Sequence, residues 1–140
     1  MKSRFFTRFA MIATLVAALG STAHAVESSH LRANISFPFK AFSADMPSGH
    51  YEFAISSNSG VPVFTMRSDS GKTAMVVGQY MVSSRKNLRP RLTFTCAGDN
   101  CGLTEVWSPG GTGWATTSPK LNSSDKERLV TVYMDRAAGE

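Results

Sequence analysis

Hydrophobic and polar residues alternate with a period of two along most of the chain beyond residue 30, and long helical periodicity is nearly absent. In segment 34–40, for example, Ile35, Phe37 and Phe39 share one face. Successive side chains of a β-strand point to opposite faces, so this alternation predicts strands with one buried face. The pattern predicts strands at 34–40, 50–55, 61–67, 73–82, 91–97 and 101–108.

Two of these segments indicate their own place in a sheet. Segment 73–82 (TAMVVGQYMV) is apolar on both faces, which predicts a central strand that is covered on both sides. Pro38 lacks the N–H group that a ladder requires, so segment 34–40 is expected at a sheet edge or at a bulge. Residues typical of turns separate the segments, at 46–49 (MPSG), 56–60 (SSNSG), 68–72 (SDSGK) and 109–113 (PGGTG).

The clearest unit is a hairpin over residues 91–108, with its turn at 97–100 (AGDN). A self-consistent register is given by three cross-strand pairs: Cys96–Cys101, Phe94–Leu103 and Leu92–Glu105. This register places Trp107 on the same face as Leu103, and Glu105 is the one charged residue on that face.

The C-terminal segment leaves two alternatives open. Ser124 and Glu127 fit a capping box that begins a short helix, whereas segment 129–134 (LVTVYM) is rich in β-branched residues and favours a final strand. Six or more short strands separated by turns are typical of sandwiches and barrels. We therefore predict an all-β fold, a single small antiparallel β-sandwich or barrel, with or without a short C-terminal helix.

The first 25 residues have the three parts of a secretory signal peptide. Lys2, Arg4 and Arg8 precede an apolar run at 9–20 (FAMIATLVAALG), and 21–25 (STAHA) ends in the small-x-small pattern that signal peptidase cleaves. The run is shorter than the roughly 20 residues that span a bilayer. We expect cleavage after Ala25, one β-rich domain at 26–140 with no transmembrane segment, and a periplasmic or extracellular location.

Cleavage also changes the charge of the protein. The chain has a formal net charge of +5, but Lys2, Arg4 and Arg8 leave with the signal. The remaining domain is only weakly basic, so its charge predicts no nucleic-acid partner.

Cys96 and Cys101 are the only cysteines of the chain. In an oxidising compartment, cysteines that face each other across a hairpin are expected to form a structural disulfide. A zinc site would need two further ligands nearby, and a thioredoxin-like site would need the spacing Cys-x-x-Cys. We predict a disulfide, with neither a metal nor a cofactor.

The sequence contains few groups suited to catalysis. His30 and His50 are the only histidines beyond the signal, and no Gly-x-Ser-x-Gly or His-Glu-x-x-His motif occurs. The Gly-rich segment 109–113 lacks the Lys-Ser/Thr of a phosphate loop, so a turn is the simpler interpretation. We identify no catalytic residue.

Two features could support binding. Arg85, Lys86, Arg89 and Arg91 form a basic patch that could hold carboxylate or phosphate groups of a polymer, or could simply be a solvated loop. Trp107 and Trp114 flank the Gly-rich turn and could form an aromatic platform for a sugar, although core packing of at least one of them is favoured.

Three stretches resemble a family of small secreted bacterial β-rich proteins that has no assigned activity. Segment 33–51 (ANISFPFKAFSADMPSGHY) is similar to its opening strand and Leu-Pro-Ala-Gly-x-Tyr turn, with Met46 and Ser48 in place of Leu and Ala. Segment 91–107 resembles a hairpin with a Gly-Asp turn, and 105–111 (EVWSPGG) resembles a Trp-Thr-Pro-Gly-Gly segment. The resemblance implies a β-rich fold and no activity, and the family pattern has other residues at the two cysteine positions.

These observations favour a non-catalytic structural or binding module of the cell envelope or extracellular space, whose partner would be an envelope polymer or another envelope protein. One alternative is an anionic polysaccharide-binding domain that uses the basic loop. Another is an enzyme or redox protein whose site assembles from dispersed residues, namely Cys96, Cys101, His50 and Glu105.

Overall fold

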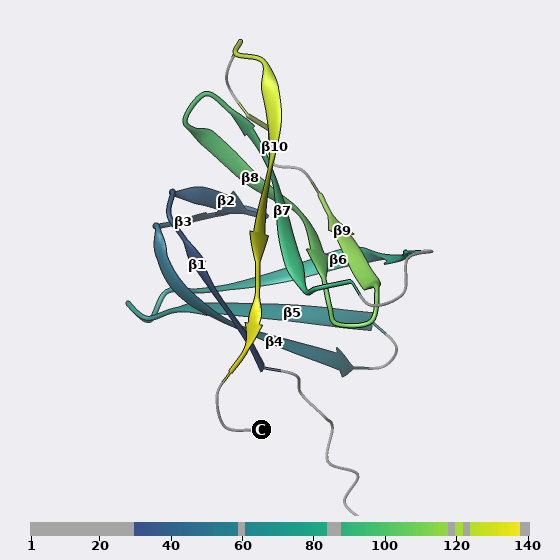
Figure 1. Ribbon diagram of the computed structural model, residues 1–140. Helices are drawn as coiled ribbons and strands as arrows, with labels where there is room; N and C mark the ends of the chain where they lie inside the picture. Colours follow the sequence, from purple (N-terminus) through teal and green to yellow (C-terminus); the bar gives the residue numbers. More distant parts are fainter. Residues whose placement is uncertain (1–29, 59–60, 84–87, 118–119, 122–123, 138–140) are drawn as a thin grey trace, which may run out of the picture.

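The computed structural model describes residues 30–58, 61–83, 88–117, 120–121 and 124–137, and all the regular structure in these ranges is β (Figure 1). The predicted all-β class is therefore confirmed. Within the described ranges no helix is long and apolar enough to cross a membrane. The signal peptide predicted at 1–25 lies outside them. The strands are β1 (His30–Ile35), β2 (Phe39–Ala41), β3 (Ala44–Met46), β4 (Gly49–Asn58), β5 (Val61–Ser68), β6 (Thr73–Val82), β7 (Arg91–Ala97), β8 (Asn100–Trp107), β9 (Thr112–Thr116), β10 (Glu127–Tyr133) and β11 (Asp135–Arg136).

The strands form one mixed sheet in the order β10-β7-β8-β9-β6-β5-β4-β1-β11, with β2 and β3 attached beside β8. The β2–β8 pairing is parallel and the other ladders are antiparallel, so the sheet is not purely antiparallel as expected. In Figure 1, β4, β5 and β6 cross the lower half of the molecule, while β7, β8 and β10 run steeply above them.

Strand β6 belongs to both parts of this sheet. Residues 73–77 pair with β5, and residues 78–82 pair with β9. At the change of partner, a Cβ on Gly78 would lie 2.8 Å from Cβ of Trp114 and 2.9 Å from the carbonyl oxygen of Ala115. A glycine is needed here because the neighbouring strand approaches so closely.

The C-terminal strands connect the two ends of the strand order. β10 pairs with β7 at one end, β11 pairs with β1 at the other, and only Met134 separates β10 from β11. Met134 is buried, and its N–H donates a hydrogen bond to the carbonyl oxygen of Pro90. Of the two alternatives left open for the C-terminal segment, the strand is the one observed, since β10 begins at Glu127. The alternating β-branched residues of 129–134 made the strand alternative the better one.

The core consists of the inward-facing residues that the alternation predicts, including Phe53, Phe64 and Met66. Aromatic rings pack at its centre, where the ring of Phe39 lies 5.1 Å from that of Phe94 and 5.4 Å from that of Tyr51. The expected strand 34–40 is divided, because β1 ends at Ile35 and β2 begins at Phe39. Pro38 lies in the break, consistent with its missing N–H group.

The expectation that strand 73–82 is covered on both faces is wrong. Ala74 and Val76 are buried, but Met75 and Val77, on the other face, are 63% and 53% exposed. Val82 alternates onto the face of Val76 and is 69% exposed, so the described strands cover the inner face of β6 only near Ala74 and Val76, and the outer face there remains open to solvent.

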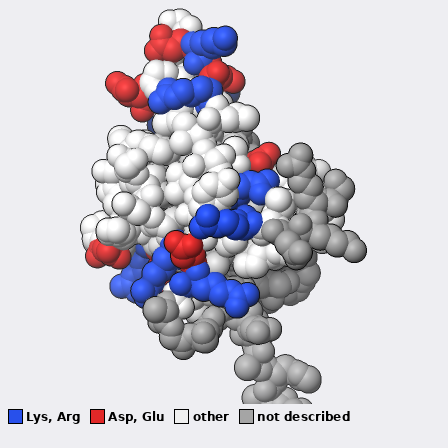
Figure 2. Space-filling model, in the orientation of Figure 1, with Lys and Arg blue, Asp and Glu red and all other residues white. Residues whose placement is uncertain are grey.

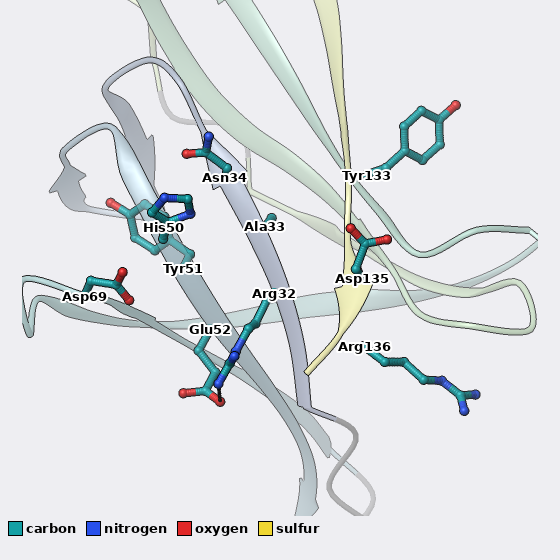
Figure 3. A pocket seen from close by; sticks show the side chains of 10 residues that line it. All are labelled: Arg32, Ala33, Asn34, His50, Tyr51, Glu52, Asp69, Tyr133, Asp135 and Arg136. Atoms are coloured by element: carbon teal, nitrogen blue, oxygen red, sulfur yellow. Dashed lines mark ion pairs between the residues drawn. The ribbon is translucent and has the colours of Figure 1, made fainter. Parts of the chain in front are cut away.

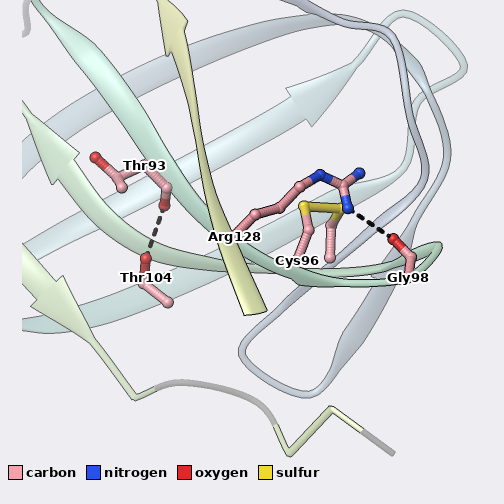
Figure 4. Close-up of a disulfide and its surroundings, with 6 residues drawn as sticks. Thr93, Cys96, Gly98, Thr104 and Arg128 are labelled. Atoms are coloured by element: carbon pink, nitrogen blue, oxygen red, sulfur yellow. Dashed lines mark hydrogen bonds between the residues drawn. A yellow bond between two sulfur atoms is a disulfide. The ribbon is translucent and has the colours of Figure 1, made fainter. Parts of the chain in front are cut away.

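Strands β7 and β8 form the predicted hairpin, which the Cys96–Cys101 disulfide joins near its turn (Figure 4). The predicted pairs Cys96–Cys101 and Phe94–Leu103 are present. Arg128 of β10 donates a hydrogen bond to the carbonyl oxygen of Gly98 in the turn, at 3.1 Å.

Beyond Phe94 the predicted register is wrong, because a β-bulge shifts it between Thr93 and Phe94. Leu92 pairs with Val106 rather than with Glu105. One extra residue on β8 turns the Val106 side chain into the core, and Glu105 faces outward. The bulge also moves Trp107 to the outer face, which creates the surface described next.

Candidate functional site

Arginine and aromatic side chains alternate on the outer face of β7, β8 and β10 and on the segment just before β7, which carries Arg89. The guanidinium of Arg91 lies 4.9 Å from the ring centre of Trp107, and that of Arg89 lies 4.8 Å from the ring centre of Tyr133. Tyr133 pairs with Arg91 across β10 and β7, and Arg91 pairs with Trp107 across β7 and β8. We call Arg89, Tyr133, Arg91 and Trp107 the Arg–aromatic ladder.

Trp107 is the fixed end of this ladder. Its ring covers Gly113 of β9, where an added Cβ would lie 2.5 Å from Cε3 of the indole. Its Nε1 donates a hydrogen bond to Oε2 of Glu105 at 2.9 Å. Because Trp107 is only 8% exposed, its ring holds the Arg91 guanidinium rather than offering a free face to a sugar.

The opposite end of the ladder is exposed. Tyr133 is 53% exposed, and the Arg89 side chain is 65% exposed and forms an ion pair with Asp135 at 3.3 Å. An ion pair as exposed as this one contributes at most about 1 kcal/mol, so an anionic ligand can replace Asp135 at little cost.

A shallow pocket of about 350 Å³ borders the ladder. Its lining combines two ladder rings and one guanidinium with two hydroxyl groups and one apolar side chain, from Ser83, Leu88, Arg91, Trp107, Thr131 and Tyr133. The pocket therefore offers a cation next to aromatic and hydroxyl groups, a combination suited to a ligand with both carboxylates and hydroxyls.

The structure describes only part of the basic patch predicted from the sequence. Arg89 and Arg91 both belong to the ladder, whereas Arg85 and Lys86 lie outside the described residues. The sequence alone did not reveal Tyr133 as the partner of these arginines, because the pairing of β10 with β7 joins positions that are distant along the chain.

The core packing that the sequence favours for at least one tryptophan is confirmed for Trp114, and the alternative of one platform formed by both rings is not realised. Trp114 pairs with Val106 and packs in the core, with its ring centre 4.3 Å from that of Phe64. Trp107 pairs with Gly113, one position along each strand, so its side chain lies on the other face of the sheet.

A second, larger recess lies where the C-terminal strand leaves β1 (Figure 3). We call it the charged cleft. Its volume is about 710 Å³. Apart from Ala33, its lining consists of polar side chains of β1, β4 and the C-terminal strands together with Asp69: Arg32, Asn34, His50, Tyr51, Glu52, Asp69, Tyr133, Asp135 and Arg136. Glu52 lies 3.7 Å from Arg32 and 3.9 Å from His30. Tyr133 belongs both to this cleft and to the ladder.

Lys and Arg side chains gather over the lower part of the face that carries β11, with an acidic group among them (Figure 2). Further charged side chains of both signs gather at the top of that view.

The dispersed catalytic set considered from the sequence is not brought together around one recess. His50 lines the charged cleft, Glu105 accepts the hydrogen bond of Trp107, and Cys96 is fully buried in a disulfide. Within the described residues, no three His, Cys, Asp or Glu side chains are grouped so that they could hold a metal ion.

Comparison with known proteins adds no relative: no protein-family model, curated protein or solved structure matches the chain.

Proposed function

We propose that residues 26–140 form a non-catalytic binding module that works outside the cytoplasm and binds an anionic polymer through the Arg–aromatic ladder. The predicted signal peptide and the Cys96–Cys101 disulfide support a periplasmic or extracellular location. The supporting observation for binding is the stacking of Arg91 on Trp107 and of Arg89 on Tyr133.

The stacking matters because it orders two cations before a ligand arrives. A free arginine loses side-chain entropy when a ligand fixes it. An arginine that is already held by a cation–π contact loses less entropy on binding. The planar guanidinium binds a carboxylate through two parallel hydrogen bonds. Two such groups near an exposed tyrosine suit a uronic-acid polymer, whose carboxylates recur along a chain of sugar rings.

Titration of the oxidised chain beginning at Val26 with polygalacturonate tests this proposal. That chain retains every described strand. We expect Arg91→Gln to weaken binding about tenfold or more, since a hydrogen bond to a charged group contributes roughly 1.5–3 kcal/mol. Added salt should weaken the wild-type complex further, because the ligand is charged.

Arg128→Gln is the matched control, because Arg128 is an exposed arginine of the same strand as Tyr133 and lies outside the ladder. It should leave polygalacturonate binding unchanged. Equal losses in both variants, or binding that is insensitive to salt, would contradict recognition by the ladder.

A further inference from the structure

The charged cleft exists because β1 is paired with the last strand, β11, over only part of the length of β1. The β1–β11 ladder comprises Leu31–Arg136 and Arg32–Asp135 and ends there. Before Met134 the chain runs along β7 instead, as strand β10. The cleft opens between Asn34 on β1 and Tyr133 on β10, and Figure 3 shows their side chains on opposite sides of it.

The charges in this cleft nearly balance. Its lining contains the cations Arg32 and Arg136 and the carboxylates Glu52, Asp69 and Asp135. Arg32 is paired with Glu52, and Asp135 is paired with Arg89 of the ladder. A cleft with balanced and paired charges exerts little net attraction on an ion of either sign, unlike the ladder beside it.

The same groups are well suited to hydroxyl groups. Each carboxylate accepts hydrogen bonds from hydroxyls, each guanidinium donates to them, and the Asn34 amide can do both. Glu52 is 45% exposed and Arg32 is 58% exposed, so neither needs to be desolvated before a ligand arrives. Tyr133 also lines the cleft, and Figure 3 shows its ring on the far side of β10 from Arg32 and Glu52, where the Arg89 guanidinium lies over it.

From this arrangement we propose that the charged cleft is a binding site for a neutral, polyhydroxylated sugar unit. Its position next to the ladder, with Tyr133 common to both, indicates that one linear glycan occupies both sites. An acidic sugar then lies on the ladder and an adjacent neutral sugar lies in the cleft. The placement of an acidic sugar on the ladder beside a neutral sugar in the cleft rests on the proposed function. The binding of a neutral sugar in the cleft does not depend on it.

Three probes separate the two sites: an oligogalacturonate, a hyaluronan oligosaccharide of equal length with alternating uronic acid and N-acetylhexosamine units, and a panel of neutral hexose and N-acetylhexosamine oligosaccharides. Each is titrated into the oxidised chain from Val26 by calorimetry. We expect the alternating glycan to bind at least tenfold more tightly than the oligogalacturonate, and at least one neutral oligosaccharide to bind measurably.

Variants assign these affinities to the sites. Asn34→Ala combined with Glu52→Gln should remove the advantage of the alternating glycan and the binding of the neutral probe, while oligogalacturonate affinity stays unchanged. Arg91→Gln should weaken both acidic probes and leave the neutral probe unaffected. Arg128→Gln is again the control, and unchanged melting temperatures show that the exposed substitutions leave the fold intact.

Failure of each proposal is recognisable separately. Equal affinity for both acidic probes, with cleft variants that change nothing, overturns the neutral-sugar site and leaves the ladder proposal standing. Cleft-dependent binding of a neutral probe without oligogalacturonate binding supports the cleft and overturns the ladder proposal. If no glycan binds, both proposals are wrong.

Discussion

The hydroxyl group of Thr104 donates a hydrogen bond to the carbonyl oxygen of Thr93 at 3.0 Å, across the β-bulge of the β7–β8 hairpin (Figure 4). A bulge disrupts the regular ladder locally, and the Thr104 side chain supplies a hydrogen bond there. This contact therefore stabilises the register that turns Val106 into the core and Trp107 toward Arg91.

Thr104→Val should destabilise the protein by about 1 kcal/mol, because it keeps the shape of the side chain and removes one intramolecular hydrogen bond. Chemical denaturation measures the change. Thr131→Val on the exposed face of β10 is the control and should stay within about 0.5 kcal/mol of wild type. A similar effect of both variants would show that the hydroxyl of Thr104 does not stabilise the bulge.

Adjacent residues of β6 provide a matched test of its open outer face. Val76 is fully buried and Val77 is 53% exposed. Val76→Ala should lower the free energy of unfolding by roughly 2 kcal/mol, from lost burial and the cavity left behind. Val77→Ala should lower it by less than about 0.5 kcal/mol. Comparable losses from both would indicate that β6 is covered on both faces after all.

Removal of the disulfide should change stability and spare binding. The loop closed by Cys96 and Cys101 is short, and the chain-entropy relation gives about 2 kcal/mol for it. The Cys96→Ser, Cys101→Ser double variant should therefore melt at a lower temperature and keep its affinity for polygalacturonate, since neither residue belongs to the ladder. A thiol titration of the oxidised wild type should find no free thiol. Loss of binding at unchanged stability would instead favour a redox or catalytic role.

The buried Tyr51 should make stability depend on pH in the alkaline range. Its hydroxyl donates a hydrogen bond to the carbonyl oxygen of Pro47, and burial raises the pKa of the phenol above its ordinary value of 10.0. In the unfolded chain the phenol loses its proton near pH 10, before the folded chain does. The contribution of Tyr51 to stability is thus complete below that pH and is lost as the pH rises through the folded-state pKa.

Tyr51→Phe should flatten this alkaline decline and lower stability at neutral pH by about 1 kcal/mol through the lost hydrogen bond. Denaturation curves collected from neutral to alkaline pH measure both effects. An alkaline decline of equal slope in wild type and variant would assign it to other groups.

Local patterning was sufficient to predict the fold class and most strands. Segment 73–82 matches β6 at both ends, because turn residues bound it clearly. The prediction that both faces of β6 are covered was wrong, because the exposed Met75 and Val77 cannot be distinguished from buried residues by hydrophobicity alone. An apolar pattern indicates which side chains of a strand are able to be buried. It does not indicate whether a second layer of structure covers them.

The candidate sites depend on long-range pairing, which local patterns do not contain. Glu105 was the one charged residue on the apolar face of the predicted hairpin, and that conflict was the only sequence signal of the bulge. The ladder requires Tyr133 beside Arg91, and the cleft requires β1 beside β11, contacts that join distant parts of the chain. For the tryptophans the sequence correctly favoured core packing of at least one, but only the strand pairing shows that Trp107 and Trp114 lie on opposite faces.

The pairing of β1 with β11 also determines when this protein can finish folding. Its first described strand must find residues 135–136, which lie far along the chain, and the N–H of Ala137 donates a hydrogen bond to the carbonyl oxygen of His30. Closing so long a loop is slow and yields no contact until both ends are present. A nascent chain in which residues 135–136 have not yet been synthesised therefore lacks its closing strand, and it leaves the edge of β1 that β11 later occupies without its native partner.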